Sequence, residues 1–217
     1  MRLKKILQIS VLKSLYFNLH CFGVKGLGFP VLVSRKCRLK LCGQVQVSDY
    51  SLGSVTIGFG GSDGIIDNNY SYFSVSEGAT VIFRGKAGIS SGSSIRTDYG
   101  SLVIGDKFST NKNCFIACSK GITIGDNVTL GWNVNIRDND GHTIIDLNTN
   151  TVSKSKEVKI GSHVWICAYA DLMKGTVIPD DSVVSYRSLV TKAFNGSNIL
   201  IGGVPAKVLK ENIGWKY

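Results

Sequence analysis

The fold is decided by residues 160–190, which read IGSHVWICAYADLMKGTVIPDDSVVSYRSLV. Branched apolar residues recur there at every sixth position: Ile160, Ile166, Leu172, Ile178, Val184 and Val190. Mostly small residues follow each of them after four places: Val164, Ala170, Thr176, Ser182, Ser188 and Phe194. Strand patterns repeat every two residues and helical patterns about every 3.6, so a period of six predicts a short strand, a corner and a restart. Three such units make one triangular coil.

The same period continues upstream at Ile124, Leu130 and Ile136, at Ile104, Thr110 and Ile116, and more loosely at Phe83, Ile89 and Ile95. Residues 137–159 break the period with polar residues, as a loop extruded from a solenoid does. One coil cannot bury its inward face alone, so the stack needs capped ends. We predict an all-β chain in three segments: a basic helix and lead-in strands over 1–48, a parallel β-helix over 49–203, and a C-terminal helical tail over 204–217.

Composition agrees with one domain of repeated short strands. The chain has 217 residues, 43% of them hydrophobic, with 25 glycines but only 3 prolines, which favours many tight corners over a disordered chain. Six irregularly spaced cysteines match neither a disulfide framework nor paired zinc ligands, so we interpret them as reduced, mostly packed thiols and expect no metal. The glycine string 58–64 is interpreted as a corner, because no helical pattern follows it.

The first 48 residues contain nine Lys and Arg and no acid before Asp49, out of a formal net charge of +10. Such a segment is typical of surfaces that face anionic lipid or an acidic glycan, and equally of a solvated or oligomer-packing face. Apolar residues recur at helical spacing, which predicts an amphipathic helix lying on the protein or on a membrane: Leu3, Ile6, Leu7, Val11, Leu12 and Leu15. Without a cleavage site or a spanning helix, we expect a cytoplasmic protein, with peripheral attachment to the inner face of the membrane as an open alternative.

The stretches IGDNVTLGWNVNIRDNDGHTI, IGSHVWIC and GGVPAKVLKENIGW resemble the hexapeptide-repeat O-acetyltransferases, and the N-terminal region is similar to the capsule and O-antigen subgroup. The resemblance implies a left-handed β-helix and a homotrimer. It further implies transfer of an acetyl group from acetyl-CoA to a sugar hydroxyl in surface polysaccharide biosynthesis.

The resemblance makes His142, in the protruding loop, the general base that takes the proton of the acceptor hydroxyl. Imidazole suits this role because it is largely unprotonated at neutral pH. Asp138 and Asp140 are candidates to orient the ring or are mere turn formers. Asn113 aligns with an active-site asparagine of galactoside acetyltransferases, or is a corner asparagine with positive φ. Trp132 lines the acceptor pocket or covers a corner.

For acetyl-CoA, the resemblance implies a groove between neighbouring subunits, with these residues beside it: Trp165, Ala168, Tyr186, Arg187, Thr191, Lys192, Lys207 and Lys210. The lysines would balance the phosphates of CoA. Cys167 replaces a usual glycine and Ser185–Arg187 a small-residue corner, which puts the shape of this groove and the identity of the acyl donor in doubt.

Two other functions remain open at this point. One is a non-catalytic β-helix that binds an acidic polymer. The other, disfavoured because His20, His142 and His163 lack the spacing of zinc ligands, is an enzyme like the γ-class carbonic anhydrases. A nucleic-acid role is disfavoured too, because the basic residues form no recognised module.

Overall fold

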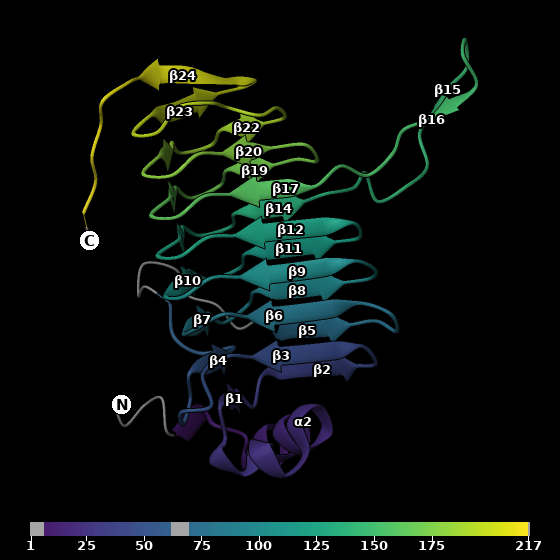
Figure 1. Ribbon diagram of the computed structural model, residues 1–217, viewed down its shortest axis with the longest axis vertical. Helices are drawn as coiled ribbons and strands as arrows, with labels where there is room; N and C mark the ends of the chain where they lie inside the picture. The colour runs from purple at the N-terminus through teal and green to yellow at the C-terminus, as the bar shows by residue number, and fades with distance from the viewer. Residues whose placement is uncertain (1–6, 62–69, 217) are drawn as a thin grey trace.

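The chain forms a triangular prism of stacked coils, as the computed structural model in Figure 1 shows. The structure describes residues 7–61 and 70–216. Each coil contributes one strand to each of three sheets, and its strands pair in parallel with those of the next coil. The predicted left-handed parallel β-helix is confirmed.

The three sheets contain nine, seven and six strands. The nine-stranded sheet contains β1 (Val31–Val33), β4 (Val55–Ile57), β7 (Ala87–Ile89), β10 (Phe108–Thr110), β13 (Thr129–Leu130), β18 (Trp165–Ile166), β21 (Val183–Val184), β23 (Leu200–Gly203) and β24 (Ala206–Lys210). The seven-stranded sheet contains β2 (Cys37–Leu41), β5 (Ser71–Val75), β8 (Ser94–Thr97), β11 (Phe115–Cys118), β14 (Asn135–Arg137), β19 (Asp171–Leu172) and β22 (Leu189–Val190). The six-stranded sheet contains β3 (Gln44–Val47), β6 (Thr80–Phe83), β9 (Ser101–Ile104), β12 (Gly121–Ile124), β17 (Val158–Ile160) and β20 (Val177–Ile178).

The six-residue period corresponds to the inward-facing ladder of the prism. Ile166 pairs with Val184 and Leu172 with Val190, so residues one coil apart stack on the same face. The six residues from Ile160 to Val190 that carry the period are all at most 3% exposed. Burying each such side chain contributes roughly 1.5–3 kcal/mol, so this ladder is the main source of stability.

The N-terminal end of the core is filled by aromatic rings. Phe17, from helix α2 (Val11–Phe22), packs on Phe73 with ring centroids 5.6 Å apart, and Phe73 packs on Phe83 at 6.3 Å. The predicted N-terminal helix is confirmed by α2, which the 3-10 helix η1 (Gly23–Gly28) follows. The strands of residues 31–48, β1, β2 and β3, pair in parallel with β4, β5 and β6. The division at residues 48 and 203 stays a prediction.

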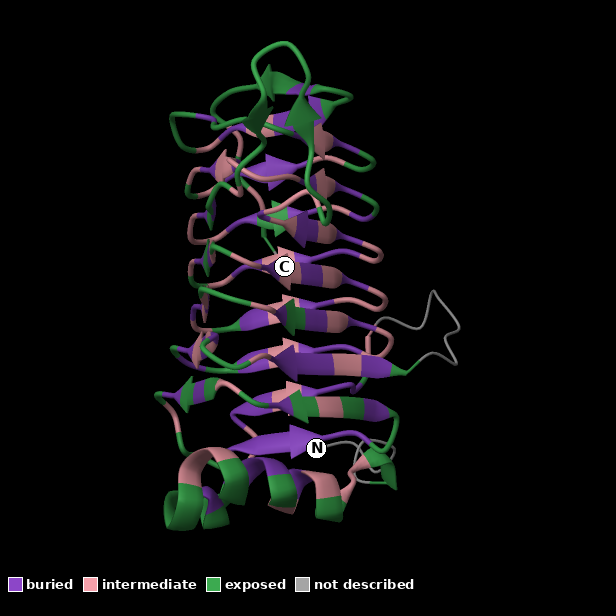
Figure 2. Ribbon diagram, turned by 90° about the vertical axis from the view of Figure 1, so that its right-hand side faces the viewer, coloured by how far each residue is buried: buried purple, intermediate pink, exposed green. Residues whose placement is uncertain are grey.

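Helix α2 lies on the prism through polar side chains. Ser14 Oγ accepts a hydrogen bond from the Val33 N–H at 2.9 Å, and the Asn18 amide bonds both the N–H and the carbonyl of Val31. These bonds satisfy the free edge of β1, which a terminal strand otherwise leaves open. Phe17 points into the core, whereas the opposite surface of α2 points outward, as its exposed segments in Figure 2 show, with Leu12 80% exposed. Leu3 and Ile6 lie outside the described residues.

The predicted C-terminal helix is wrong. Residues 206–210 form β24, which runs antiparallel to β23 and closes the nine-stranded sheet. The unpaired edge of β23 outweighs the helix propensity of the segment AKVLKE, because strand pairing satisfies backbone groups that a separate helix would leave open. The tail then descends beside the prism, where the Ile213 N–H donates to the Asn198 carbonyl.

Candidate active site

The corners of the prism form three edges. The Asn113 edge joins the nine-stranded to the seven-stranded sheet and contains corners 58–61, 90–93, 111–114, 131–134, 167–170 and 185–188. The His142 edge joins the seven-stranded to the six-stranded sheet and contains corners 98–100, 119–120, 138–157, 173–176 and 191–192. The His163 edge joins the six-stranded to the nine-stranded sheet and contains corners 125–128, 161–164 and 179–182.

A long loop leaves the His142 edge between β14 and β17. It ends in the hairpin β15 (Ile145–Asp146) and β16 (Thr151–Val152), which stands away from the prism in Figure 1. Asp138 is fully buried at its base and accepts three backbone hydrogen bonds, from Ser119, Lys120 and Gly121, at 2.7–2.8 Å. The carboxylate thus ties the loop to the preceding coil.

A second set of contacts joins the loop to the prism on both sides of the hairpin, at Asp140 before it and at Ser153 after it. Lys174, on the corner above, donates to the carboxylate of Asp140 and to the hydroxyl of Ser153, and Ser153 also donates to Asp140. These hydrogen bonds, first from Lys174 and then from Ser153, lower the pKa of the Asp140 carboxyl. Asp140 is therefore ionised at neutral pH, and the cluster of Lys174, Asp140 and Ser153, called the clamp below, is intact there.

We expect Lys174→Met to release the loop at neutral pH, because Asp140 and Ser153 lose their shared donor. Amide hydrogen exchange over residues 140–153 measures this, with Lys154→Met, an exposed lysine on the same limb, as the control. The lowered carboxyl pKa means that the wild-type clamp is complete above the ordinary carboxyl pKa of about 3.9 and is lost as pH falls through the lower folded value. Equal exchange in both variants would contradict the clamp.

His142 itself is exposed and faces a shallow hollow of about 540 Å³ lined by Tyr99, Ser119 and Ser155, among others. In the described part of the chain, no hydrogen bond joins its ring to Asp138 or Asp140. Both carboxylates are engaged elsewhere, so neither orients the imidazole within one chain as the sequence had suggested. The structure leaves the ring free to meet a group from outside.

Two site residues on the Asn113 edge carry unpaired polar atoms. Asn113 Oδ1 and Trp132 Nε1 are buried, and neither has a hydrogen-bond partner among the described residues. Asn113 has a φ of 62°, so it is also a corner residue in the left-handed region. A buried acceptor and a buried donor without partners are costly unless a ligand or water binds them.

An aromatic and cationic cluster lies higher on the Asn113 edge. The rings of Tyr169 and Tyr186 meet edge-on with centroids 5.5 Å apart, and the Arg187 guanidinium lies 5.5 Å and 5.6 Å from them. Ala168 is buried beside this corner. The bulky Ser185–Arg187 corner thus forms an exposed stacking surface.

The other predicted cofactor residues lie elsewhere on the chain. Thr191 and Lys192 are exposed on the His142 edge, Trp165 is 40% exposed on β18, and Lys207 and Lys210 are exposed on β24. One chain therefore does not gather the predicted residues into one groove. His142 and Asn113, the two principal candidates, lie on different edges.

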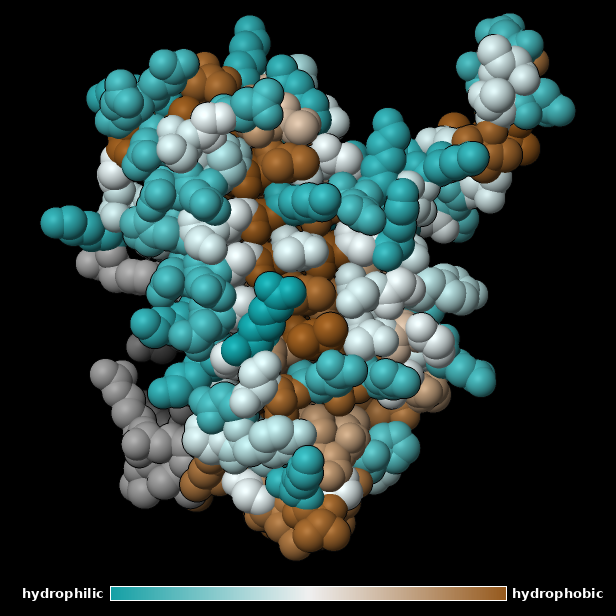
Figure 3. All heavy atoms as spheres, viewed as in Figure 1, coloured by the Kyte–Doolittle hydropathy of each residue, from teal (hydrophilic) through white to brown (hydrophobic). Residues whose placement is uncertain are grey.

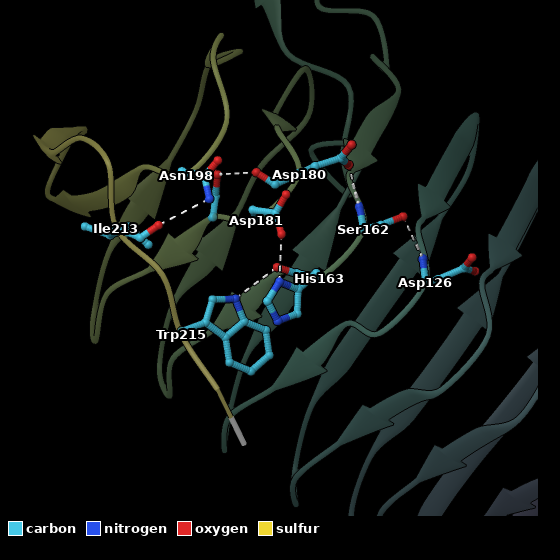
Figure 4. Close-up of polar contacts among 9 residues, drawn as sticks. Asp126, Ser162, His163, Asp180, Asp181, Asn198, Ile213 and Trp215 are labelled. Atoms are coloured by element: carbon cyan, nitrogen blue, oxygen red, sulfur yellow. Dashed lines mark hydrogen bonds and ion pairs between the residues drawn. The ribbon is translucent and has the colours of Figure 1, made fainter.

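A histidine that the sequence analysis weighed only as a zinc ligand is held in a defined environment on the His163 edge (Figure 4). His163 Nδ1 lies 2.8 Å from Asp181 Oδ1, and Trp215 stacks on the imidazole at 4.4 Å while its Nε1 donates to the His163 carbonyl. These contacts bind the tail to the prism. The separation of His163 and Asp181 by one coil of three hexapeptides is a signal that could have revealed the pair.

The cysteines are mostly packed thiols, as predicted, and Cys42 is exposed. Cys37, Cys114 and Cys118 are buried, and burial raises the pKa of each to about 12. Burial raises the pKa of Cys167 to about 11 as well. A protonated thiol is a poor nucleophile, so this chemistry favours direct attack by an acceptor over an acyl-cysteine intermediate.

Sequence comparison identifies relatives over the repeat region. The chain is 36% identical to the galactoside O-acetyltransferase of Escherichia coli K12 over 115 residues, covering 52% of this chain and 56% of the relative. It is 32% identical to the polysialic acid O-acetyltransferase of E. coli O1:K1 over 126 residues, covering 57% and 41%. The chain thus spans about half the length of the curated relatives it matches, and no family model matches it.

The fold has counterparts among solved structures. An N-acyltransferase from Bacillus cereus, solved with dTDP and 3-hydroxybutyryl-CoA, superposes with a TM-score of 0.53 at 16% identity, covering 94% of this chain and 89% of that one. At this identity the likeness concerns the fold alone. Both of the sequence relatives described above are O-acetyltransferases, so the resemblance to the hexapeptide-repeat family is confirmed.

Proposed function

We propose that this protein transfers an acetyl group from acetyl-CoA to a hydroxyl of a saccharide used in surface polysaccharide biosynthesis. The observation that carries the proposal is the placement of His142 on a braced loop that projects from a left-handed β-helix. O-acetyltransferase relatives over the same region support it.

The separation of the two edges supports an active site between chains. His142 and Asn113 lie on different edges of one prism, so a site that contains both needs a second chain. A homotrimer related by a three-fold axis brings the His142 edge of one subunit against the Asn113 edge of its neighbour, three times over. The projecting loop has the reach for such a contact.

We expect the purified protein to have three times its chain mass of 23.4 kDa. Light scattering coupled to size exclusion measures this directly. A complementation test sharpens it, because His142→Ala and Asn113→Ala variants, mixed after dissociation and reassembled, regain part of the activity only if the two residues act across an interface. A monomer with full activity would contradict the arrangement.

In the proposed reaction, a ring nitrogen of His142 accepts the proton of the acceptor hydroxyl as its oxygen attacks the thioester carbon. The C–O bond forms, the C–S bond breaks, and the proton passes from His142 to the departing thiolate of CoA. Asn113 Oδ1 and Trp132 Nε1 hold acceptor groups, one accepting and one donating a hydrogen bond. Both atoms are buried and have no hydrogen-bond partner among the described residues, which supports this role.

The acetyl donor, acetyl-CoA, would lie near the C-terminal coils of the prism. Trp165, Ala168 and the Tyr186–Arg187 corner suit the pantetheine and pyrophosphate, while the exposed Thr191, Lys192, Lys207 and Lys210 supply hydrogen bonds and charge to phosphate. Their distribution over several faces fits a groove built from two subunits.

The outward face of α2 supports attachment to an anionic membrane surface. Leu7, Val11, Leu12 and Tyr16 are 52–80% exposed, and Val24 in η1 is 82% exposed. Figure 3 shows hydrophobic side chains exposed at the N-terminal end of the prism. Nine cations and no acid precede Asp49, which complements anionic lipid. None of the described helices is long and apolar enough to cross a bilayer.

We expect Leu12→Glu to abolish binding to vesicles that contain phosphatidylglycerol, because it places a charge at the centre of the apolar face. Vesicle flotation measures the loss, and raised salt should weaken wild-type binding in the same assay. Leu147→Glu, a 92% exposed position on the projecting hairpin, is the matched control. Equal binding by both variants would contradict membrane attachment through α2.

An acetyl-CoA consumption screen against bacterial sugar acceptors tests the activity itself. A non-catalytic β-helix that binds an acidic polymer predicts no release of CoA with any acceptor. The transferase predicts release with at least one, and dependence of that release on His142.

A further inference from the structure

The glycine string of the N-terminal coils forms one wall of a cationic pocket on the Asn113 edge. Residues 58–61 form a corner, whereas residues 62–64 of the predicted corner 58–64 lie outside the described residues, and Gly58, Gly60 and Gly61 have φ values of 85°, 67° and 98°. A Cβ atom at Gly61 would lie 2.5 Å from Lys112 Cγ, so the absent side chain lets the lysine lie across this corner.

The pocket has a volume of about 360 Å³, at the low end of the range typical of small-ligand sites. Arg35, Lys36 and Lys112 line it together with the hydroxyl-bearing Ser34 and Ser91, and no described lining residue is acidic. Arg35 and Lys36 are exposed and form no ion pair within the described part of the chain. Their charge is available to an anion.

The pocket adjoins the proposed acceptor site. Lys112 precedes Asn113 in the chain, and the Asn113 N–H donates to the carbonyl of Ser91, which lines the pocket. An acceptor whose hydroxyl lies at Asn113 can therefore extend along the same edge toward Arg35 and Lys36.

We propose that this pocket binds an anionic group, carboxylate or phosphate, on the saccharide acceptor, so that the preferred substrate is an acidic saccharide. The inference rests on the acetyl transfer proposed above. Guanidinium and ammonium groups beside flexible corner glycines and hydroxyls match the charge and the hydrogen-bonding needs of such an anion. A neutral sugar has no anionic group with which these cations could form an ion pair.

The test compares two double variants with the same change of charge. Arg35→Gln/Lys36→Gln removes the pocket cations, and Arg38→Gln/Lys40→Gln removes two exposed cations of strand β2 that do not line the pocket. We expect the pocket variant alone to weaken pyrophosphate binding, measured by calorimetry with saturating CoA present to occupy the donor site, and to raise KM for sialyllactose. Each effect should be about tenfold, the effect of losing one charge-assisted hydrogen bond. KM for neutral lactose and kcat should stay unchanged.

Equal weakening by both double variants would overturn the proposal in favour of a general surface charge. Loss of binding to phosphatidylglycerol vesicles in the pocket variant, with unchanged KM for sialyllactose, would assign the pocket to a lipid headgroup and overturn the saccharide assignment. Absence of transfer to any acceptor by the wild type would reject the proposed function, while pyrophosphate binding still decides whether the pocket holds an anion.

Discussion

Replacing His142 by alanine is expected to lower acetyl transfer by about two to four orders of magnitude, the range that loss of a general base causes. An alcohol is a weak nucleophile until its proton is removed. In the described structure the ring of His142 is exposed on the loop and has no partner that would divert it, so its removal deletes the base without disturbing the prism.

The measurement is kcat with a responsive acceptor, together with the Kd for acetyl-CoA. The Kd should change little, because the proposed donor contacts involve Lys192, Lys207 and Lys210. His142→Gln is a second variant that keeps a polar side chain but offers no base. A kcat within about threefold of wild type would reject His142 as the base, since general-base loss costs far more.

Replacing Asp138 by alanine is expected to lower the melting temperature by about 10 °C and to abolish most activity. Three backbone N–H groups lose their acceptor, which costs about 3 kcal/mol in the free energy of unfolding, and roughly 2–4 °C follows from each kcal/mol in a chain of this size. The base of the loop is released at the same time, so His142 loses its position.

Calorimetry at a fixed protein concentration measures the decrease in melting temperature. Asp98→Ala is the matched control, because Asp98 lies on the same edge but forms an exposed ion pair with Arg96 at 2.8 Å, worth about 1 kcal/mol or less. A decrease in melting temperature for Asp138→Ala no larger than that for Asp98→Ala would contradict the role of Asp138 in holding the base of the loop.

The repeat region was predictable because its signal is local and periodic. Each inward residue from Ile160 to Val190 meets its counterpart one coil away, so spacing alone determines which side chains stack. The C-terminal segment was not predictable in this way. Its conformation depends on the unpaired edge of β23, a partner that the spacing of AKVLKE does not reveal.

The candidate site was predictable as a set of residues but not as an arrangement. Asp138 and Asp140 look alike in the motif RDNDGH, yet one faces the backbone of the coil below and the other faces Lys174 on the coil above. Counting hexapeptides would have placed Asn113 and His142 on different corners. It would not have revealed that Asn113 Oδ1 and Trp132 Nε1 are buried without partners in the described part of the chain, which depends on side-chain packing.

The antiparallel strand β24 has a consequence for association between prisms. A parallel ladder that ended at β23 would offer a row of free backbone groups on which another molecule could continue the stack, as in a growing fibre. β24 runs against that direction, and at the opposite end Ser14 and Asn18 of α2 occupy the edge of β1. A parallel continuation of the nine-stranded sheet by another prism is therefore disfavoured at both ends.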